Sequence, residues 1–388
     1  MADILLPRAD RTLSAYTLGS VTLPKPAAVP NWNRIVFAAA HVVTDPLSNA
    51  DPSGPPVIDW EPTLSFRAHL LGLGFGIAEA MDTAQRGMGL DWPNALELVK
   101  KSLAAAKPVE RARIFSGVGT DQLLPADARS LDDVTAAYLE QLHAVQKLGG
   151  RVILMASRAL ARVARSPDDY RKVYARVLSE ADQPVILHWL GEMFDPSLSG
   201  YWGGDEFAKT LPVALGVISD SVAKVDGIKI SLLDAEKEIF MRRQLPQSVK
   251  MYTGDDFNYP ELIAGDGHGF SHALLGIFDP IAPAAAVAFD ALASGDRKTY
   301  DWVFAPTVPL ARLIFESPTR YYKSGVVFLG YLNGFQDHFV MIGGQQAMRS
   351  VQHYADIFRL ADQAGLLRDR EMAVARMRRV LALSGIGV

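Results

Sequence analysis

Short apolar runs alternate with amphipathic stretches through most of the chain, and this alternation is the main structural signal in the sequence. The runs are rich in Val, Ile, Leu and Phe, as is typical of strands covered on both faces. They lie at residues 34–40, 74–78, 112–117, 151–155, 184–188, 225–231, 249–253 and 269–272. The stretches between them predict helices at 59–73, 92–106, 131–148, 166–181 and within 203–220. Strands interleaved with helices indicate parallel βαβ units.

Eight such strands predict a closed (β/α)₈ barrel, the TIM barrel of the α/β class. A barrel of this kind needs about 250 residues, and residues 31–290 provide that length. Residues 1–30 contain several prolines and are predicted to be irregular. Residues 291–388 have few strand-like runs, so we expect a C-terminal helical extension.

Composition excludes several classes of function. The 388 residues carry a net charge of -4, which argues against a nucleic-acid partner because such proteins need a basic surface. The chain has no cysteine, so thiolate catalysis and disulfides are excluded. The first thirty residues lack the features of a secretory signal, and no apolar stretch is long enough to span a bilayer. We therefore expect a cytoplasmic protein that does not bind membranes.

Lys229 is the most informative single residue, because it lies inside the predicted strand 225–231. Burial disfavours the charged form of an amine and lowers its pKa. An uncharged lysine can attack a carbonyl carbon and form a Schiff base. The alternative is a structural lysine, whose ammonium reaches water at the strand end or pairs with a carboxylate such as Asp255 or Asp256.

Other polar residues follow the predicted strands, and in a barrel the C-terminal ends of the strands form the active site. Because so many polar groups would meet at one rim, we expect an enzyme. These positions are His41, residues 79–83, residues 117–120, Ser157, His188, Lys229, Asp255, Asp256 and His272.

Six segments of the chain together resemble one known family. They are Gly227-Ile228-Lys229, Pro184 to Trp189, Ser116 to Thr120, the pair Tyr252 to Asp256 and Ala264 to Ser271, and Ala293 to Asp296. Over about residues 31–350 the chain resembles the dihydrodipicolinate synthase and N-acetylneuraminate lyase family of Schiff-base aldolases. In that family the lysine of a Gly-x-Lys motif forms the imine.

The resemblance implies a lyase or aldolase in which Lys229 forms a Schiff base with a 2-keto acid or a keto sugar. His188 stands where the family has a catalytic tyrosine, which implies a general acid/base. The resemblance also implies a small carbonyl substrate, no organic cofactor and a homo-oligomer. The residues expected to bind substrate are Thr83, Asp82, Ser157, Gly119, Asp255, Asp256 and Ser271.

The chain departs from the family where the substrate carboxylates bind. Ala80-Met81-Asp82-Thr83-Ala84-Gln85 stands in place of a Gly-Thr-Thr-Gly-Glu loop, and Asp82 would repel a carboxylate. No arginine occurs in Trp189 to Pro196, where the synthase holds its second acidic substrate. Lysine biosynthesis is therefore not expected.

Two alternatives stay open. One is a metal-dependent sugar isomerase or epimerase, with a metal held by His41, Asp45 and His272, since imidazole and carboxylate ligands suit zinc or manganese. The spacing of these residues fits no stringent metal motif, so we predict no metal. The other alternative is a barrel that binds a metabolite without catalysis.

Overall fold

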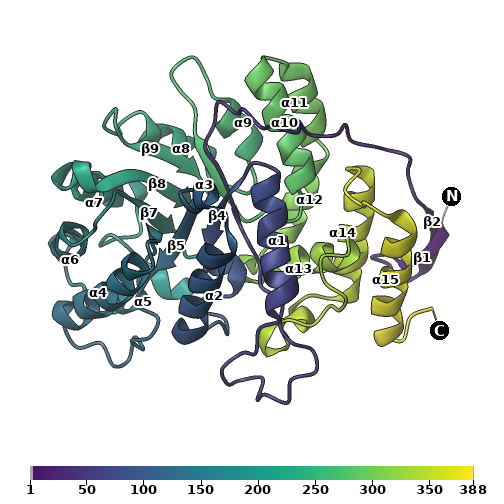
Figure 1. Cartoon of the computed structure of the whole chain (residues 1–388), viewed down its shortest axis with the longest axis horizontal. Coiled ribbons are helices and arrows are strands. Elements are labelled where there is room, and N and C mark those ends of the chain that lie inside the picture. The colour runs from purple at the N-terminus through teal and green to yellow at the C-terminus, as the bar shows by residue number, and fades with distance from the viewer. Residues whose placement is uncertain (1–2, 388) are drawn as a thin grey trace. The chain divides into compact units, whose positions relative to one another are not determined.

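The computed structural model describes residues 3–387 and contains a closed barrel of eight parallel strands. Hydrogen bonding runs in the order β10-β3-β4-β5-β6-β7-β8-β9 and closes on itself. The predicted TIM barrel is thus confirmed (Figure 1). The strands are β3 (Val36–Ala39), β4 (Gly76–Glu79), β5 (Ile114–Val118), β6 (Arg151–Leu154), β7 (Val185–Leu190), β8 (Val225–Ser231), β9 (Lys250–Thr253) and β10 (His272–Leu275).

The eighth strand lies further along the chain than predicted. The prediction placed it at 269–272, whereas β10 starts at His272, and its apolar residues Ala273 and Leu274 pair with Val36 and Phe37 of β3. Ser271 therefore precedes the strand, and His272 begins it. Both residues thus lie at the N-terminal end of β10, whereas the prediction placed them at the C-terminal end of the last strand.

Apolar side chains fill the interior of the barrel. They alternate along the strands, as expected when every second residue faces inward. Gly227 of β8 has no side chain here, because a Cβ atom would lie 2.6 Å from a ring carbon of Tyr252. The interior residues are Phe37, Ala39, Ala78, Met81, Phe115, Ile153, Ile186, Tyr252 and Leu274.

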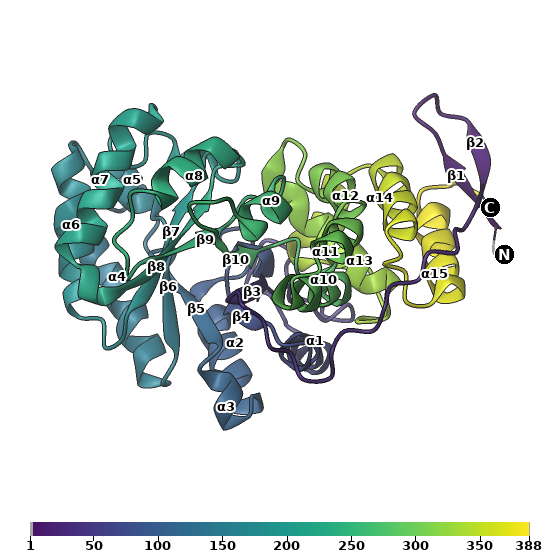
Figure 2. The ribbon, with the colours of Figure 1, turned by 90° about the horizontal axis from the view of Figure 1, so that it is seen from above.

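The barrel belongs to a compact unit made of residues 34–40 and 75–276. Side-chain caps hold the first turns of two of its helices: the Ser130 hydroxyl accepts the N–H of Asp133, and the Asp169 carboxylate accepts the N–H of Ser166. In Figures 1 and 2, α4, α6 and α7 lie outside the strands. The helices are α2 (Trp92–Ala105), α3 (Pro108–Arg111), α4 (Leu131–Lys147), α5 (Arg158–Val163), α6 (Pro167–Ser179), α7 (Phe207–Asp220), α8 (Ala235–Arg242) and α9 (Tyr259–Ala264).

A second compact unit combines three chain segments: residues up to 33, residues 41–74, and residues from 277 onward. It holds the C-terminal helices, which were predicted. Its first segment is not wholly irregular, because β1 and β2 form an antiparallel hairpin. Residues 1, 2 and 388 of the predicted terminal segments lie outside the described residues. The elements are β1 (Asp3–Pro7), β2 (Leu13–Thr17), α1 (Trp60–Gly72), α10 (Ala282–Ser294), α11 (Arg297–Phe304), α12 (Thr307–Ile314), α13 (Tyr322–Leu332), α14 (Val351–Gln363) and α15 (Arg370–Leu383).

The hairpin packs on α14 within this unit. The Tyr16 hydroxyl donates to the buried carboxylate of Asp362 at 2.8 Å, and the Tyr16 ring meets Phe358 edge to face. Asp362 also accepts the backbone N–H of Gly19 at 2.8 Å. The buried carboxylate of Asp362 thus accepts hydrogen bonds from both Tyr16 and Gly19 at the end of the hairpin.

Candidate active site

Lys229 points into the barrel. On β8 it pairs with His188 of β7 on one side and with Tyr252 of β9 on the other. Residues paired across parallel strands share a face of the sheet, and Tyr252 belongs to the interior cluster. Gly254 leaves room for the lysine, because a Cβ atom there would lie 2.7 Å from Cε of Lys229. The Gly-Ile-Lys and Thr-Gly-Asp-Asp motifs therefore meet around one side chain.

The Lys229 amine is buried and has no close partner. Only 8% of the residue is exposed. Within residues 3–387, no carboxylate lies within 4.0 Å of the amine, and no acceptor forms a hydrogen bond with it. Burial lowers the pKa of Lys229 below 10.5, although the charges of Asp256 and Asp82 act in the opposite direction. The alternative in which a tight carboxylate pair holds this lysine is not what the structure shows.

His188 is a buried, neutral imidazole beside the lysine. Its Nε2 lies 3.3 Å from the hydroxyl of Ser231, and its Nδ1 has no hydrogen-bond partner among the described residues. Burial, together with the charge of Lys229, holds the pKa of His188 well below 6.5. The imidazole can therefore accept a proton at neutral pH.

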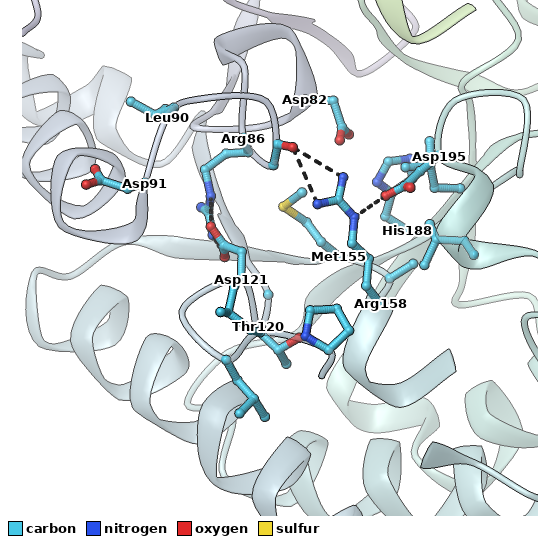
Figure 3. A pocket seen from close by; sticks show the side chains of 18 of the residues that line it. Asp82, Arg86, Leu90, Asp91, Thr120, Asp121, Met155, Arg158, His188 and Asp195 are labelled. Atoms are coloured by element: carbon cyan, nitrogen blue, oxygen red, sulfur yellow. Dashed lines mark hydrogen bonds and ion pairs between the residues drawn. The ribbon is translucent and has the colours of Figure 1, made fainter. Parts of the chain in front are cut away.

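A cavity of about 260 Å³ opens at the C-terminal ends of β4 to β7. His188 and Asp82 both line it, and Lys229 lies next to His188 without lining it. Figure 3 shows the Asp82 carboxylate directed into this space. The lining residues are Asp82, Arg86, Gly87, Gly89, Leu90, Asp91, Gly119, Thr120, Asp121, Leu123, Leu124, Pro125, Met155, Ala156, Arg158, His188, Leu190, Asp195 and Leu198.

Two arginines of the cavity wall were not predicted. Arg86 is buried and forms an ion pair with Asp121, and it donates to the carbonyl oxygen of Gly117 at 3.1 Å. Its remaining N–H groups reach the carbonyl of Ala80 at 3.3 Å and the side-chain oxygen of Gln141 at 3.1 Å. Arg86 thus ties the loop after β4 to the loop after β5.

Arg158, the first residue of α5, is the second arginine. It pairs with Asp195, from the loop after β7, and donates to the carbonyl oxygen of Gly87 at 3.4 Å. Figure 3 shows this arginine between the two loops. Residues 189–196 contain no arginine, and Arg158 is 37 residues from its partner Asp195 in the sequence.

Only some of the residues expected to bind substrate line the cavity. Gly119 and Asp82 line the cavity, whereas Thr83 and Ser157 are buried without lining it. Ser157 caps α5 by accepting the N–H of Leu160 at 2.9 Å. Its hydroxyl also lies 2.6 Å from the hydroxyl of Thr120, which does line the cavity, so it can orient that group.

The remaining predicted residues have structural partners. Asp255 accepts the backbone N–H groups of Phe257 and Asn258 and the Asn258 amide, so it stabilises the turn before α9. The Ser271 hydroxyl donates to the buried carboxyl group of Glu238 at 2.7 Å. Asp256 is buried, and its charge acts on Lys229.

The three residues considered for a metal have other partners. His41 pairs through Nδ1 with Asp279 at 2.8 Å, both side chains being buried. Asp45 accepts the N–H of Leu47, and His272 accepts the N–H of Ile35. Within residues 3–387, no group of three His, Cys, Asp or Glu side chains could hold a metal ion.

No helix in the described part of the chain combines the length and the apolar character needed to cross a bilayer. Localisation in the cytoplasm stays a prediction.

The family model described as "Protein of unknown function (DUF993)" matches residues 4–386 of the sequence. The chain belongs to this family. No curated protein matches the chain.

Solved structures of dihydrodipicolinate synthases have the same fold. A putative dihydrodipicolinate synthetase from Pseudomonas aeruginosa is 15% identical, with a TM-score of 0.61 over 84% of this chain and 99% of that chain. The synthase from Aquifex aeolicus is 12% identical, with a TM-score of 0.62 over 87% of this chain and 100% of that one. The synthase from Acinetobacter baumannii, solved with pyruvate, is 15% identical with a TM-score of 0.61, over 86% and 99% of the two chains. The resemblance seen in the sequence is thus confirmed at the level of the fold.

One similar structure is described as a monomeric dihydrodipicolinate synthase variant; it is 16% identical, with a TM-score of 0.58, over 91% of this chain and 97% of that chain. Proteins of this fold therefore include a monomer, and the homo-oligomer implied by the resemblance stays a prediction for this chain.

Proposed function

We propose that the protein is a lyase of the class I aldolase type, in which Lys229 forms a Schiff base with a small ketone substrate. The observation that supports this most directly is the environment of the Lys229 amine, which is buried, has no ion-pair partner among the described residues and lies beside a neutral imidazole. A structural lysine in a barrel interior would be expected to have a paired carboxylate. The fold shared with dihydrodipicolinate synthases is consistent with this assignment.

The chemistry requires no oxidant or reductant. The Lys229 nitrogen adds to the carbonyl carbon, and the carbinolamine then loses its oxygen as water. Starting from the ammonium, the products are one protonated imine and one water, so charge and atoms balance. The protonated imine then withdraws electrons from the adjacent carbon–carbon bond, so that this bond can break or form.

His188 is the proton acceptor in this scheme. Because its pKa is held well below 6.5, it is in the base form at neutral pH. It lines the cavity and pairs with Lys229 across the β7–β8 ladder. It would remove a proton from the carbon next to the imine, or from a substrate hydroxyl when the carbon–carbon bond breaks.

The test is reductive trapping with borohydride, followed by peptide mass spectrometry. We expect a ketone to add its reduced mass at Lys229 in the wild-type protein and no adduct in Lys229→Met. The matched control is Lys250→Met, since Lys250 lies on the neighbouring strand but pairs with Asp226 at 2.8 Å. This control should still give the adduct at Lys229. A panel of 2-keto acids and ketoses that leaves Lys229 unmodified would contradict the proposal.

A further inference from the structure

The cavity beside Lys229 carries an excess of negative charge. Its lining includes four carboxylates and two guanidiniums, which leaves two carboxylates unmatched. His188 adds no charge at neutral pH, because burial holds its pKa well below 6.5. Which of the carboxylates can bind a ligand therefore depends on the contacts that each one already makes.

Three of the four carboxylates have a structural role. Asp121 pairs with Arg86, and Asp195 pairs with Arg158. Asp91 caps α2, where it accepts the backbone N–H of Asn94 at 3.1 Å. Both guanidiniums are thus already engaged, and neither is left for an acidic substrate.

Asp82 is the fourth carboxylate, and its side chain has no hydrogen bond or ion pair within residues 3–387. It belongs to the loop after β4, lines the cavity with its carboxylate directed inward, and acts through its charge on Lys229 (Figure 3). An acceptor of this kind, facing a cavity, is free to bind a donor on a ligand.

We propose that the cavity takes an uncharged, polyhydroxylated ketone and discriminates against 2-keto acids, with Asp82 as the residue that determines this specificity. The inference rests on the proposed Schiff-base function and names its substrate class. A substrate hydroxyl would donate to Asp82, whereas a substrate carboxylate would meet a like charge. The apolar part of the lining, which includes Leu90, Leu123 and Leu198, suits the C–H groups of a short sugar chain.

The covalent step favours the same substrate class. An uncharged ketone gives a protonated imine with a net positive charge, and the charges of Asp82 and Asp256 favour a cation at the Lys229 nitrogen. A 2-keto acid would bring its own carboxylate to this position and compete with Asp82 for the same cation. With an uncharged substrate, Asp82 and Asp256 thus balance the positive charge of the imine. With a keto acid, the substrate's own carboxylate would balance it.

Dihydroxyacetone and pyruvate form a matched pair for the test, since both are three-carbon ketones and differ mainly in hydroxyls and charge. Each is trapped with borohydride at equal concentration, and the adduct at Lys229 is quantified by mass spectrometry. We expect the wild-type protein to give at least about ten times more adduct with dihydroxyacetone, which is the order expected for one hydrogen bond to a charged group.

Two substitutions of Asp82 separate charge from shape. Asp82→Asn keeps the shape but removes the charge, and we expect it to shift the ratio toward pyruvate by about tenfold or more. Asp82→Glu keeps the charge and should keep the preference for dihydroxyacetone. Circular dichroism checks that each variant is folded, and Asp82→Ser provides a second neutral variant with the same expected direction.

The outcomes distinguish the two proposals. A wild-type protein that traps pyruvate in preference, with a ratio that Asp82→Asn does not change, would overturn this inference while the Schiff-base function stands. A protein that traps neither ketone at Lys229, nor any other member of the panel, would overturn the function itself.

Discussion

Substituting Glu238 by glutamine should change how the stability of the protein depends on pH. Glu238 lies on α8, is fully buried, and accepts the hydroxyl of Ser271 at 2.7 Å. Burial raises the pKa of this carboxyl from 4.5 to about 8. Between these two values the folded protein keeps a proton that the unfolded chain releases, so the free energy of unfolding falls as the pH rises.

The size of the effect follows from the pKa difference. Each unit corresponds to about 1.4 kcal/mol, so the shift of Glu238 from 4.5 to about 8 accounts for at most about 5 kcal/mol between the two pH limits. This contribution is fully present below pH 4.5 and is lost as the pH rises to about 8. Glutamine cannot ionise, but it can still accept the Ser271 hydroxyl. Relative to wild type, Glu238→Gln should therefore gain about 2 to 5 kcal/mol between pH 4.5 and pH 8.5.

Urea unfolding at pH 4.5 and pH 8.5, followed by tryptophan fluorescence, measures this difference. Glu236→Gln is the matched control, because Glu236 lies on the same helix but is exposed. It should leave the pH dependence as in the wild type. If Glu238→Gln and wild type lose stability in parallel between the two pH values, the carboxyl is ionised in the folded state and the reasoning fails.

Three further predictions concern single contacts. Gly254→Ala should cost about 1–3 kcal/mol of stability and reduce trapping at Lys229, because the new methyl group would clash with Oγ of Ser231 and would lie 2.7 Å from both the Ile230 carbonyl oxygen and Cε of Lys229. Gly267→Ala, with open space around it, should do neither. His188→Gln should still form the borohydride adduct but slow the exchange of ketone α-hydrogens with D₂O, followed by NMR, by about 10²–10⁴-fold; an unchanged rate would exclude this imidazole as the base. Asp362→Asn should weaken the attachment of the N-terminal hairpin by about 1–3 kcal/mol, seen as faster hydrogen exchange in residues 3–17, and equal exchange would show that the carboxylate is not needed.

The barrel could be predicted from the sequence because each strand is a short apolar run, and because both faces of a parallel sheet are covered. The inward position of Lys229 follows from the same pattern. The error at β10 has a specific cause. The strand was predicted at 269–272 because the glycines and polar residues at 265–272 resemble a family motif. The apolar run Ala273–Leu275 is the part that pairs with β3.

The cavity wall could be predicted only in part. Asp82 was found because it stands in a loop that differs from a known motif. Arg86 and Arg158 were not predicted as part of the cavity wall. Their carboxylate partners lie 35 and 37 residues away on other loops, and nothing in the local sequence indicates such a pairing. For Ser271 and Asp255 the expected role in substrate binding stays a prediction. Both side chains have structural partners, because a polar residue next to a strand can equally well satisfy the protein's own buried groups.

The contact between Tyr16 and Asp362 joins residues 346 positions apart, and this sets a limit on the order of events during synthesis. A ribosome adding about 5–20 residues per second needs on the order of 20–70 seconds to cover that distance. Until then the first strand pair has no surface to dock on, whereas every strand of the barrel has already been made. The hairpin therefore lacks its partner on α14 for that interval, and a chaperone that binds exposed strands would act during it.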